Sequence, residues 1–327
     1  MKYNFNYRKI CSDLLKDLPQ KQKEVLVRRF ALEGGERETL ESIGQSFNVT
    51  RERVRQIEEE GFSKIKNKIQ EHDKALRFFV QEINSTGGLR REDVLLSGLG
   101  GKEFQPQVFF LLTLAEPFKR YSETKEFYPF WALNDKALSV AQKTISAFYS
   151  KLDKVKKPLN LSDYKVSSAL SSRAVESFLE ISKQIQKNSE GLYGLKDWPE
   201  INPRGIKDRA YLVFKKEQKP LHFMQVAKMI SSDALPQTVH NELIKDMRFV
   251  LVGRGLYALK EWGYEEGQVR DVISKVLKLA SKPLPKEKIL EQVLAQRLVK
   301  ENTILLNLSN KKYFIKDDQG RYTVKEA

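Results

Sequence analysis

Cysteine is almost absent from this chain of 327 residues. The single Cys11 excludes an internal disulfide framework and any metal site that needs several cysteines, and it fits a reducing cytoplasm. Long apolar runs are also missing, because the longest mostly apolar stretch, Val108 to Ala115, is far shorter than the roughly 20 residues of a membrane-spanning helix. The first twenty residues lack the apolar block of a secretory signal peptide. We therefore expect a cytoplasmic protein that does not enter a membrane.

Signals of catalysis are sparse as well. The three histidines, His72, His222 and His240, lie too far apart in the sequence to form a local metal-binding motif. Neither H-E-x-x-H nor a phosphate-binding G-x-x-x-x-G-K-[ST] loop occurs. We expect no enzymatic activity, no cofactor, no metal and no small-molecule substrate.

Positive charge, in contrast, is in excess. The chain holds 58 Lys and Arg against 43 Asp and Glu, a formal net charge of +15. Such an excess points to a polyanionic partner. Residues 1–76 hold 16 basic and 13 acidic side chains, so most of the excess lies in the later residues.

An internal repeat fills the chain from about residue 75 onward. The segment Gly191–Trp198 recurs as Gly255–Trp262, and a Lys-Pro-Leu tripeptide occurs at 157–159, 219–221 and 282–284. Each unit reads as helix, Lys-Pro-Leu loop, two helices and two short strands. We predict a mainly α-helical α+β fold with short β hairpins. The expected domains are 1–75, 76–135, 136–200, 201–262 and 263–327.

The third unit shows the pattern best. Pro236 suits the first turn of its third helix, where a missing N–H costs nothing. Phe249–Val252 and Leu256–Leu259 predict two strands joined by a Gly253-Arg254-Gly255 turn, where glycine supplies the positive φ that a tight hairpin needs. Three helices and a hairpin of this size describe a winged helix, and the fourth unit repeats the pattern.

The first 75 residues have a different, all-helical pattern. Thr39 is a good N-cap for a short helix that begins at Leu40, and Thr50 caps a second helix after a turn. This is the spacing of a helix-turn-helix. The side chains expected to be buried along the second helix are Val54, Ile57, Phe62, Ile65 and Ile69.

The opposite face of that second helix gathers four long polar side chains at its N-terminal turns. They are Arg51, Glu52, Arg55 and Gln56. A recognition helix meets base edges there, and Arg suits guanine, Gln suits adenine and Glu suits cytosine. Phosphate contacts are expected at the cap and on the flanks, from Thr39, Arg53, Lys64, Lys66 and Lys68. The alternative is a solvated helix face, which spacing alone does not separate from DNA reading.

Four stretches within residues 10–72 form a more specific signature. They are Leu18–Leu26, Arg29-Phe30, Thr39–Gly44 and the ten-residue run Val49–Glu58. Together they resemble region 4 of primary-type bacterial sigma factors. The resemblance implies a helix-turn-helix that reads the −35 promoter element, with Arg51, Glu52, Arg55 and Gln56 as base readers and Thr50 and Arg53 as phosphate contacts. It also implies docking on the β flap of RNA polymerase. Because no region for the −10 element precedes it, we do not expect the chain to act alone as a sigma factor.

The repeats have a family resemblance of their own. His222-Phe223, Thr238–Leu243 and Phe249–Leu259 resemble the winged-helix modules called HARE-HTH, which occur in the polymerase delta subunit and beside DNA-modifying or restriction domains. We expect a second DNA contact on the third helix of this unit and at the tip of its wing. Its residues would be Gln237, His240, Asn241, Lys245 and Arg254. The alternative for the wing is a hairpin turn with one solvated arginine.

Together these patterns predict a noncatalytic, sequence-specific transcription regulator of the bacterial nucleoid. Its sigma-like module would choose the double-stranded DNA sequence, its winged helices would add salt-sensitive backbone affinity, and RNA polymerase core would be a second partner. Two other interpretations stay open. One is a polymerase- or protein-interaction module, and the other is the DNA-targeting subunit of a modification or restriction system.

Overall fold

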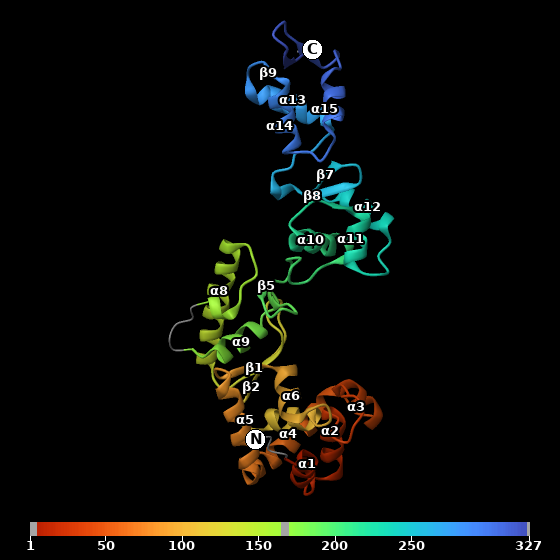
Figure 1. The fold of residues 1–327 in the computed structure, drawn as a ribbon. Helices are drawn as coiled ribbons and strands as arrows, with labels where there is room; N and C mark the ends of the chain where they lie inside the picture. Colours follow the sequence, from red (N-terminus) through yellow and green to blue (C-terminus); the bar gives the residue numbers. More distant parts are fainter. Residues whose placement is uncertain (1–4, 165–169, 326–327) are drawn as a thin grey trace. The chain divides into compact units, whose positions relative to one another are not determined.

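The computed structural model describes residues 5–164 and 170–325 (Figure 1). Helices and short antiparallel sheets make up the described chain, so the predicted fold class is confirmed. The chain divides into two compact units, residues 1–197 (unit 1) and 198–327 (unit 2). Whether the five predicted segments fold separately stays a prediction.

Unit 1 begins with a run of helices. They are α1 (Tyr7–Leu15), α2 (Gln20–Phe30), α3 (Leu40–Phe47), α4 (Arg51–Ile65) and the 3-10 helix η1 (Lys68–His72). One expectation was wrong here, because the second helix of the pair was predicted to run on to Ile69. Helix α4 instead ends at Ile65, two residues before Asn67, a weak helix former, and Ile69 is buried from η1.

The remainder of unit 1 alternates helices with short strands. Its elements are α5 (Asp73–Ser85), β1 (Leu89–Arg91), α6 (Glu92–Gly100), α7 (Gln105–Leu114), β2 (Lys119–Tyr121), β3 (Phe130–Ala132), α8 (Asp135–Val155), η2 (Leu161–Asp163), α9 (Ser172–Glu180), β4 (Ile185–Lys187) and β5 (Tyr193–Leu195). Strands β1, β3 and β2 form one sheet in that order, and β4 pairs with β5.

A single hydrophobic core joins the first helices of unit 1 to α7. Phe110 of α7 is fully buried, and its ring centroid lies 5.2 Å from that of Phe30 on α2 and 5.9 Å from that of Phe62 on α4. Trp131 of β3 is buried in the same core. Helix α7 therefore covers an apolar face of the helical segment that carries the predicted helix-turn-helix.

Unit 2 contains two further sets of elements. They are α10 (Gly205–Glu217), β6 (Leu221–His222), α11 (Phe223–Ile230), α12 (Pro236–Lys245), β7 (Phe249–Gly253), β8 (Leu256–Leu259), η3 (Lys260–Trp262), α13 (Val269–Ala280), β9 (Leu284–Pro285), α14 (Lys286–Leu294), α15 (Glu301–Leu308), β10 (Phe314–Lys316) and β11 (Arg321–Val324). Each set has its own hydrophobic core.

The same order of elements recurs along the chain. A helix, a strand, two helices and two strands follow one another at residues 73–132, 205–259 and 269–324. In each case the first strand pairs with the last, giving the sheet orders β1-β3-β2, β6-β8-β7 and β9-β11-β10. At residues 135–195 the first strand is reduced to one bridge, between Leu159 and Tyr193. The sequence of the third unit predicted this order except for its first strand. The Lys-Pro-Leu segment was expected to be a loop, but Leu221 and His222 form β6 and pair with Tyr257 and Leu256 of β8.

The two sets of unit 2 are joined through strand β7. The backbone N–H of Leu298 donates to the carbonyl of Val252 at 2.9 Å. The buried guanidinium of Arg297 donates to the carbonyls of Leu251 and Gly267. Arg297 and Leu298 therefore bind to the backbone of β7, the edge strand of the hairpin that carries Arg254.

Candidate nucleic-acid interface

Helices α3 and α4 form the predicted helix-turn-helix, and each begins at the predicted cap. The Thr39 hydroxyl accepts from the backbone N–H of Ser42 at 3.1 Å, and the Thr50 hydroxyl accepts from that of Arg53 at 3.2 Å. Each cap satisfies one of the free N–H groups at a helix start. The pair is fixed by a small core of its own, made of Val25, Ile43, Val54 and Ile57.

The turn between the two helices is unusually tight. Asn48 ends α3 in the left-handed conformation, with φ 54°, and the N–H of Val49 donates to the carbonyl of Gly44 at 3.0 Å. A Cβ atom on Gly44 would lie 2.8 Å from the carbonyl oxygen of Val49, closer than such atoms approach in proteins. Glycine at position 44 therefore sets the angle at which α4 is presented.

We predict that Gly44→Val destabilises the chain by about 1–3 kcal/mol, the usual cost of forcing extra atoms into a packed site. The free energy of unfolding in urea measures the effect. Gly98→Val is the matched control, because Gly98 lies in α6 and a Cβ there meets nothing within 4 Å. A Gly44→Val chain as stable as the wild type would contradict the tight turn.

The four predicted base-reading residues, Arg51, Glu52, Arg55 and Gln56, are all exposed at the start of α4. Their long side chains bond to neighbours on the same helix. Arg55 donates to Glu52 at 2.7 Å and to Glu59, and Arg53 donates to the amide oxygen of Gln56 at 3.0 Å. The hydrogen bonds from Arg55 lower the pKa of the Glu52 carboxyl. Exposed pairs of this kind contribute little to stability, so a stronger partner can replace them.

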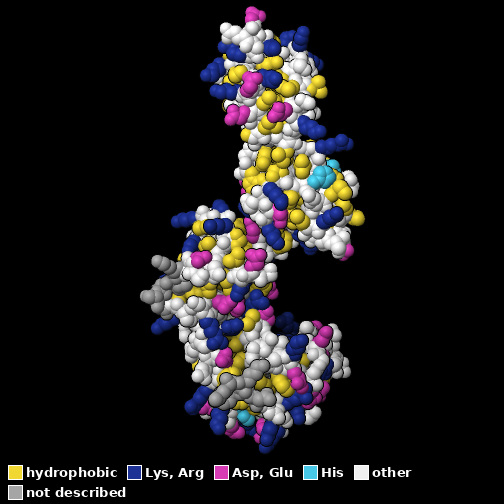
Figure 2. Space-filling model, in the orientation of Figure 1, with side chains coloured by type: hydrophobic (Ala, Val, Ile, Leu, Met, Phe, Trp, Pro, Cys, Tyr) yellow, Lys and Arg dark blue, Asp and Glu magenta, His cyan; other side chains and the backbone are white. Residues whose placement is uncertain are grey.

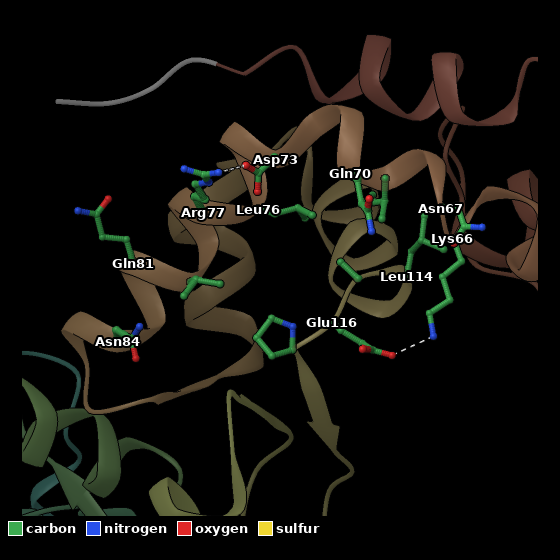
Figure 3. A pocket seen from close by; sticks show the side chains of 14 residues that line it. Lys66, Asn67, Gln70, Asp73, Leu76, Arg77, Gln81, Asn84, Leu114 and Glu116 are labelled. Carbon is green, nitrogen blue, oxygen red and sulfur yellow. Dashed lines mark hydrogen bonds and ion pairs between the residues drawn. The ribbon is translucent and has the colours of Figure 1, made fainter.

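The predicted phosphate contacts are also exposed or half-exposed, and each has a partner. Lys64 donates to Gln22 at 3.1 Å, Lys66 to Glu116 at 2.9 Å and Lys68 to Asp17 at 2.5 Å. Figure 3 shows Lys66 reaching Glu116 at one end of an open groove of about 960 Å³ along η1 and α5. Lys68 lies on η1 and not on α4, because α4 is shorter than predicted.

The sequence analysis missed a cluster of polar side chains that connects α2 with the start of α3. The Arg28 guanidinium binds the Glu38 carboxylate through two hydrogen bonds of 2.8 and 2.7 Å, and Ser42 donates to the same carboxylate at 3.1 Å. The hydrogen bond from Arg28 lowers the pKa of Glu38. This cluster ties α2 to the start of α3. The only sequence signal was an acidic residue directly before the Thr39 cap.

The second predicted contact site lies on α12 and the following hairpin of unit 2. Gln237, Asn241 and Lys245 are exposed, and Arg254 is exposed at the hairpin tip. His240 differs from the expectation that it faces outward. It is half-buried and its ring stacks on Phe223, with centroids 4.5 Å apart, because the neighbouring aromatic side chain covers that side of the helix.

The surface charge fits this picture only in outline. Figure 2 shows Lys and Arg side chains on both units, with Asp and Glu among them. Among the described residues, no group of three or more His, Cys, Asp and Glu side chains could hold a metal ion. No helix of the described ranges is long and apolar enough to cross a membrane. Because acidic and basic side chains are mixed on the surface, the exposed face of α4 is distinguished by its residue types and not by a concentration of positive charge.

The similarity to known proteins lies in the segment that contains the helix-turn-helix. The family "Sigma-70, region 4" matches residues 14–67. A protein described as RNA polymerase sigma factor SigA, from Microcystis aeruginosa, is 43% identical over 60 residues. That match covers 18% of this chain and 14% of the relative, so the chain spans only a small part of the curated protein that it resembles.

Proposed function

We propose, from the premise that residues 14–67 are a sigma-70 region 4 domain, that this protein is a DNA-binding transcription regulator that reads a −35-like promoter sequence through α4. The observation that carries the proposal is the exposure of Arg51, Glu52, Arg55 and Gln56 together at the start of a helix whose turn and caps are fixed. A recognition helix contacts base edges with its N-terminal residues.

The residue types define how this helix would read DNA. An arginine at position 51 or 55 can donate two hydrogen bonds to one guanine, and Gln56 can pair with adenine. Glu52 can accept from the amino group of cytosine. Thr39 and Thr50 directly precede α3 and α4, and Arg53 lies in the first turn of α4, where the helix dipole and the N–H groups of a helix start favour phosphate oxygens. They would fix the position of α4 while the other four residues choose the sequence.

The test is fluorescence anisotropy with the full chain, a duplex that carries a −35-like hexamer and a scrambled duplex of equal length. Titration across several salt concentrations separates the sequence-dependent part of the affinity from the backbone part. We expect tighter binding to the −35-like duplex at every salt concentration. Equal affinity for both duplexes would contradict base reading of a −35-like element.

We further propose that the four repeated sets of helices and strands are winged-helix domains and that the third contacts the DNA backbone. In support, its α12 exposes Gln237, Asn241 and Lys245, and its hairpin exposes Arg254. Residues 198–327 hold 24 Lys and Arg against 16 Asp and Glu, an excess that would add nonspecific affinity.

For this contact we predict a change in salt dependence. Lys245→Gln with Arg254→Gln should reduce the slope of log affinity against log salt by about 2, because each lost phosphate contact removes close to one released counterion. Anisotropy on the scrambled duplex measures the slope. Lys286→Gln with Lys288→Gln makes the same change in net charge at two exposed positions of α14, which belongs to the other hydrophobic core of unit 2, and should have a smaller effect. Equal slopes for the two double variants would contradict a phosphate contact at α12.

A contact with RNA polymerase is the second part of the proposed role, in view of the sigma-factor relative. Helix α7 covers one apolar face of the region 4 domain, so docking on the β flap would use another surface or displace α7. The test is to immobilise the chain and to measure whether it retains core RNA polymerase. Failure to retain the core enzyme would leave DNA reading as the only function proposed.

One observation favours a second candidate function, a protein-interaction module. Large apolar side chains are exposed on and around α12: Leu235 is 68% exposed, Ile244 63% and Met247 83%. Single exposed apolar residues are ordinary, but three on one short segment suit a protein partner better than phosphate. Ile244→Asp with Met247→Asp should then abolish polymerase capture, whereas Arg55→Ala with Gln56→Ala should preserve it.

A further inference from the structure

A cavity in unit 1 lies away from the proposed DNA-reading side chains. Its volume is about 460 Å³, and α2, α4, α7, β2 and β3 contribute to its walls. Its polar lining comes mainly from three arginines, Arg29, Arg37 and Arg120, and its apolar lining includes Phe62, Phe109 and Trp131. The volume is within the range of about 300–1,000 Å³ typical of small-molecule sites.

The ring of Phe109 is the centre of this arrangement. The Arg37 guanidinium carbon lies 3.8 Å from the ring centroid, and that of Arg120 lies 5.4 Å from it. Trp131 meets the same ring edge-on, with centroids 5.7 Å apart. Two guanidinium groups therefore converge on one aromatic side chain, which stacks with them but does not neutralise them.

The charges lining the cavity are not balanced. Arg120 forms hydrogen bonds of 2.5 and 2.9 Å with Glu92, and Arg29 lies 3.5 Å from Glu58 and donates to the carbonyl of Glu38 at 3.0 Å. Arg37 forms no hydrogen bond or ion pair with any described residue. One cation that lines the cavity thus has no described carboxylate within ion-pair distance, although the charge of Glu92 acts on it.

The titration behaviour agrees with this geometry. Loss of hydration lowers the pKa of Arg37, the negative charge of Glu92 raises it, and the positive charges of Arg120 and Arg29 lower it further. Burial raises the pKa of Glu58, the one carboxylate among the described residues that line the cavity. An anion bound beside Arg37 would reduce the repulsion among the arginines and would accept hydrogen bonds from the exposed Arg37 guanidinium.

The larger groove of Figure 3 lacks this imbalance. Its two cations, Lys66 and Arg77, are paired with Glu116 and Asp73, as the dashed lines in the figure mark. The smaller cavity differs from it in having an unpaired arginine and a wall of aromatic rings. A ligand that carries both an anionic group and a flat ring therefore suits the smaller cavity better than this groove.

We propose that this cavity binds a nucleotide, with a phosphate group on Arg37 and Arg29 and the base against the partly exposed rings of Phe62 and Phe118, which also lines the cavity. None of the proposed base-reading residues lines the cavity. Glu58, however, belongs to α4, so a bound nucleotide would contact the helix that carries those residues. The site is thus a ligand site distinct from the DNA-reading face and adjacent to it.

Thermal unfolding and isothermal titration calorimetry of the full chain test the proposal, with AMP and GMP as probes and with inorganic phosphate, adenosine and guanosine as comparisons. At least one nucleotide should raise the melting temperature and bind with a Kd of about 1 mM or below, at least about tenfold tighter than phosphate or its nucleoside. Arg37→Gln should weaken nucleotide binding about tenfold or more, because it removes hydrogen bonds to a charged group.

Arg77→Gln is the matched control, because Arg77 is 80% exposed, belongs to the same unit and lines only the larger groove. It should bind the nucleotide as the wild type does. The proposal is overturned if neither nucleotide binds, if phosphate or the nucleoside alone binds as tightly, or if Arg37→Gln and Arg77→Gln have equal effects. It is also overturned if Arg37→Gln weakens only duplex DNA binding.

Discussion

Replacing Arg55 and Gln56 together by alanine should remove most of the preference for a −35-like duplex over a scrambled one. Each lost base contact costs about 1–3 kcal/mol of discrimination, so the double variant should lose about 2–6 kcal/mol. Affinity for the scrambled duplex should change far less, because phosphate contacts supply most of it. Anisotropy with the two duplexes at one salt concentration measures both quantities.

The effect should not come from unfolding, because both side chains are exposed and α4 keeps its Thr50 cap and its buried face. The partners of Arg55 in the free chain, Glu52 and Glu59, are exposed and easily exchanged for a base edge. Arg8→Ala with Lys9→Ala removes two exposed cationic side chains from α1 and is the control. If this control lost as much preference as the α4 variant, the assignment of base reading to α4 would be wrong.

Replacing Phe110 by alanine should destabilise the chain by about 3–5 kcal/mol, the range observed for a large aromatic side chain removed from a core. Phe110 is fully buried between Phe30 of α2 and Phe62 of α4, although it lies on α7, outside the region 4 domain. Urea unfolding of the full chain, followed by circular dichroism, measures the loss. Tyr149→Ala, at a side chain that is 38% exposed on α8, should cost much less.

The same variant tests whether residues 5–132 fold around one core. Hydrogen exchange should show that Phe110→Ala reduces protection in α2 and α4 as well as in α7, because the three helices share the cavity left behind. Loss of protection confined to α6 and α7, with α1 to α4 unchanged, would contradict the shared core.

Local features of the fold could be predicted because they depend on neighbouring residues. Thr39 and Thr50 were expected to cap the two helices of the helix-turn-helix and do so. The turn at Gly253 to Gly255 was expected to join two strands and does, because glycine allows the positive φ of 71° at Gly255. Periodicity and capping act within a few residues, so one sequence suffices to recognise them.

Features that depend on distant contacts could not be predicted. Nothing in the periodicity of α7 indicated that Phe110 would pack on Phe30 and Phe62, since apolar residues occur all around this helix. His240 was expected to face outward, but its ring stacks on Phe223. This contact depends on how α11 and α12 cross, which helical spacing does not predict. The cavity beside Arg37 was missed for the same reason, since its walls come from five separate elements.

The candidate DNA-reading face stands between these cases. Helical spacing predicted which of its residues are exposed, and the family match places them in a region 4 segment. Only a binding experiment with DNA distinguishes base reading from a solvated helix face. Its side chains bond to one another in the free chain, as the pairs of Arg55 with Glu52 and of Arg53 with Gln56 illustrate. Such pairs form on ordinary helix surfaces as well.

The most direct test of sequence reading by α4 is a base-substitution scan of the −35-like duplex. Every base pair of the hexamer is changed in turn, and the affinities of the wild type, Arg51→Ala, Arg55→Ala and Gln56→Ala are measured at one salt concentration. We predict that each variant becomes indifferent to substitution at one or two positions and keeps its discrimination at the others. A uniform loss of affinity, with the pattern of discrimination unchanged in all three variants, would contradict base reading by this helix.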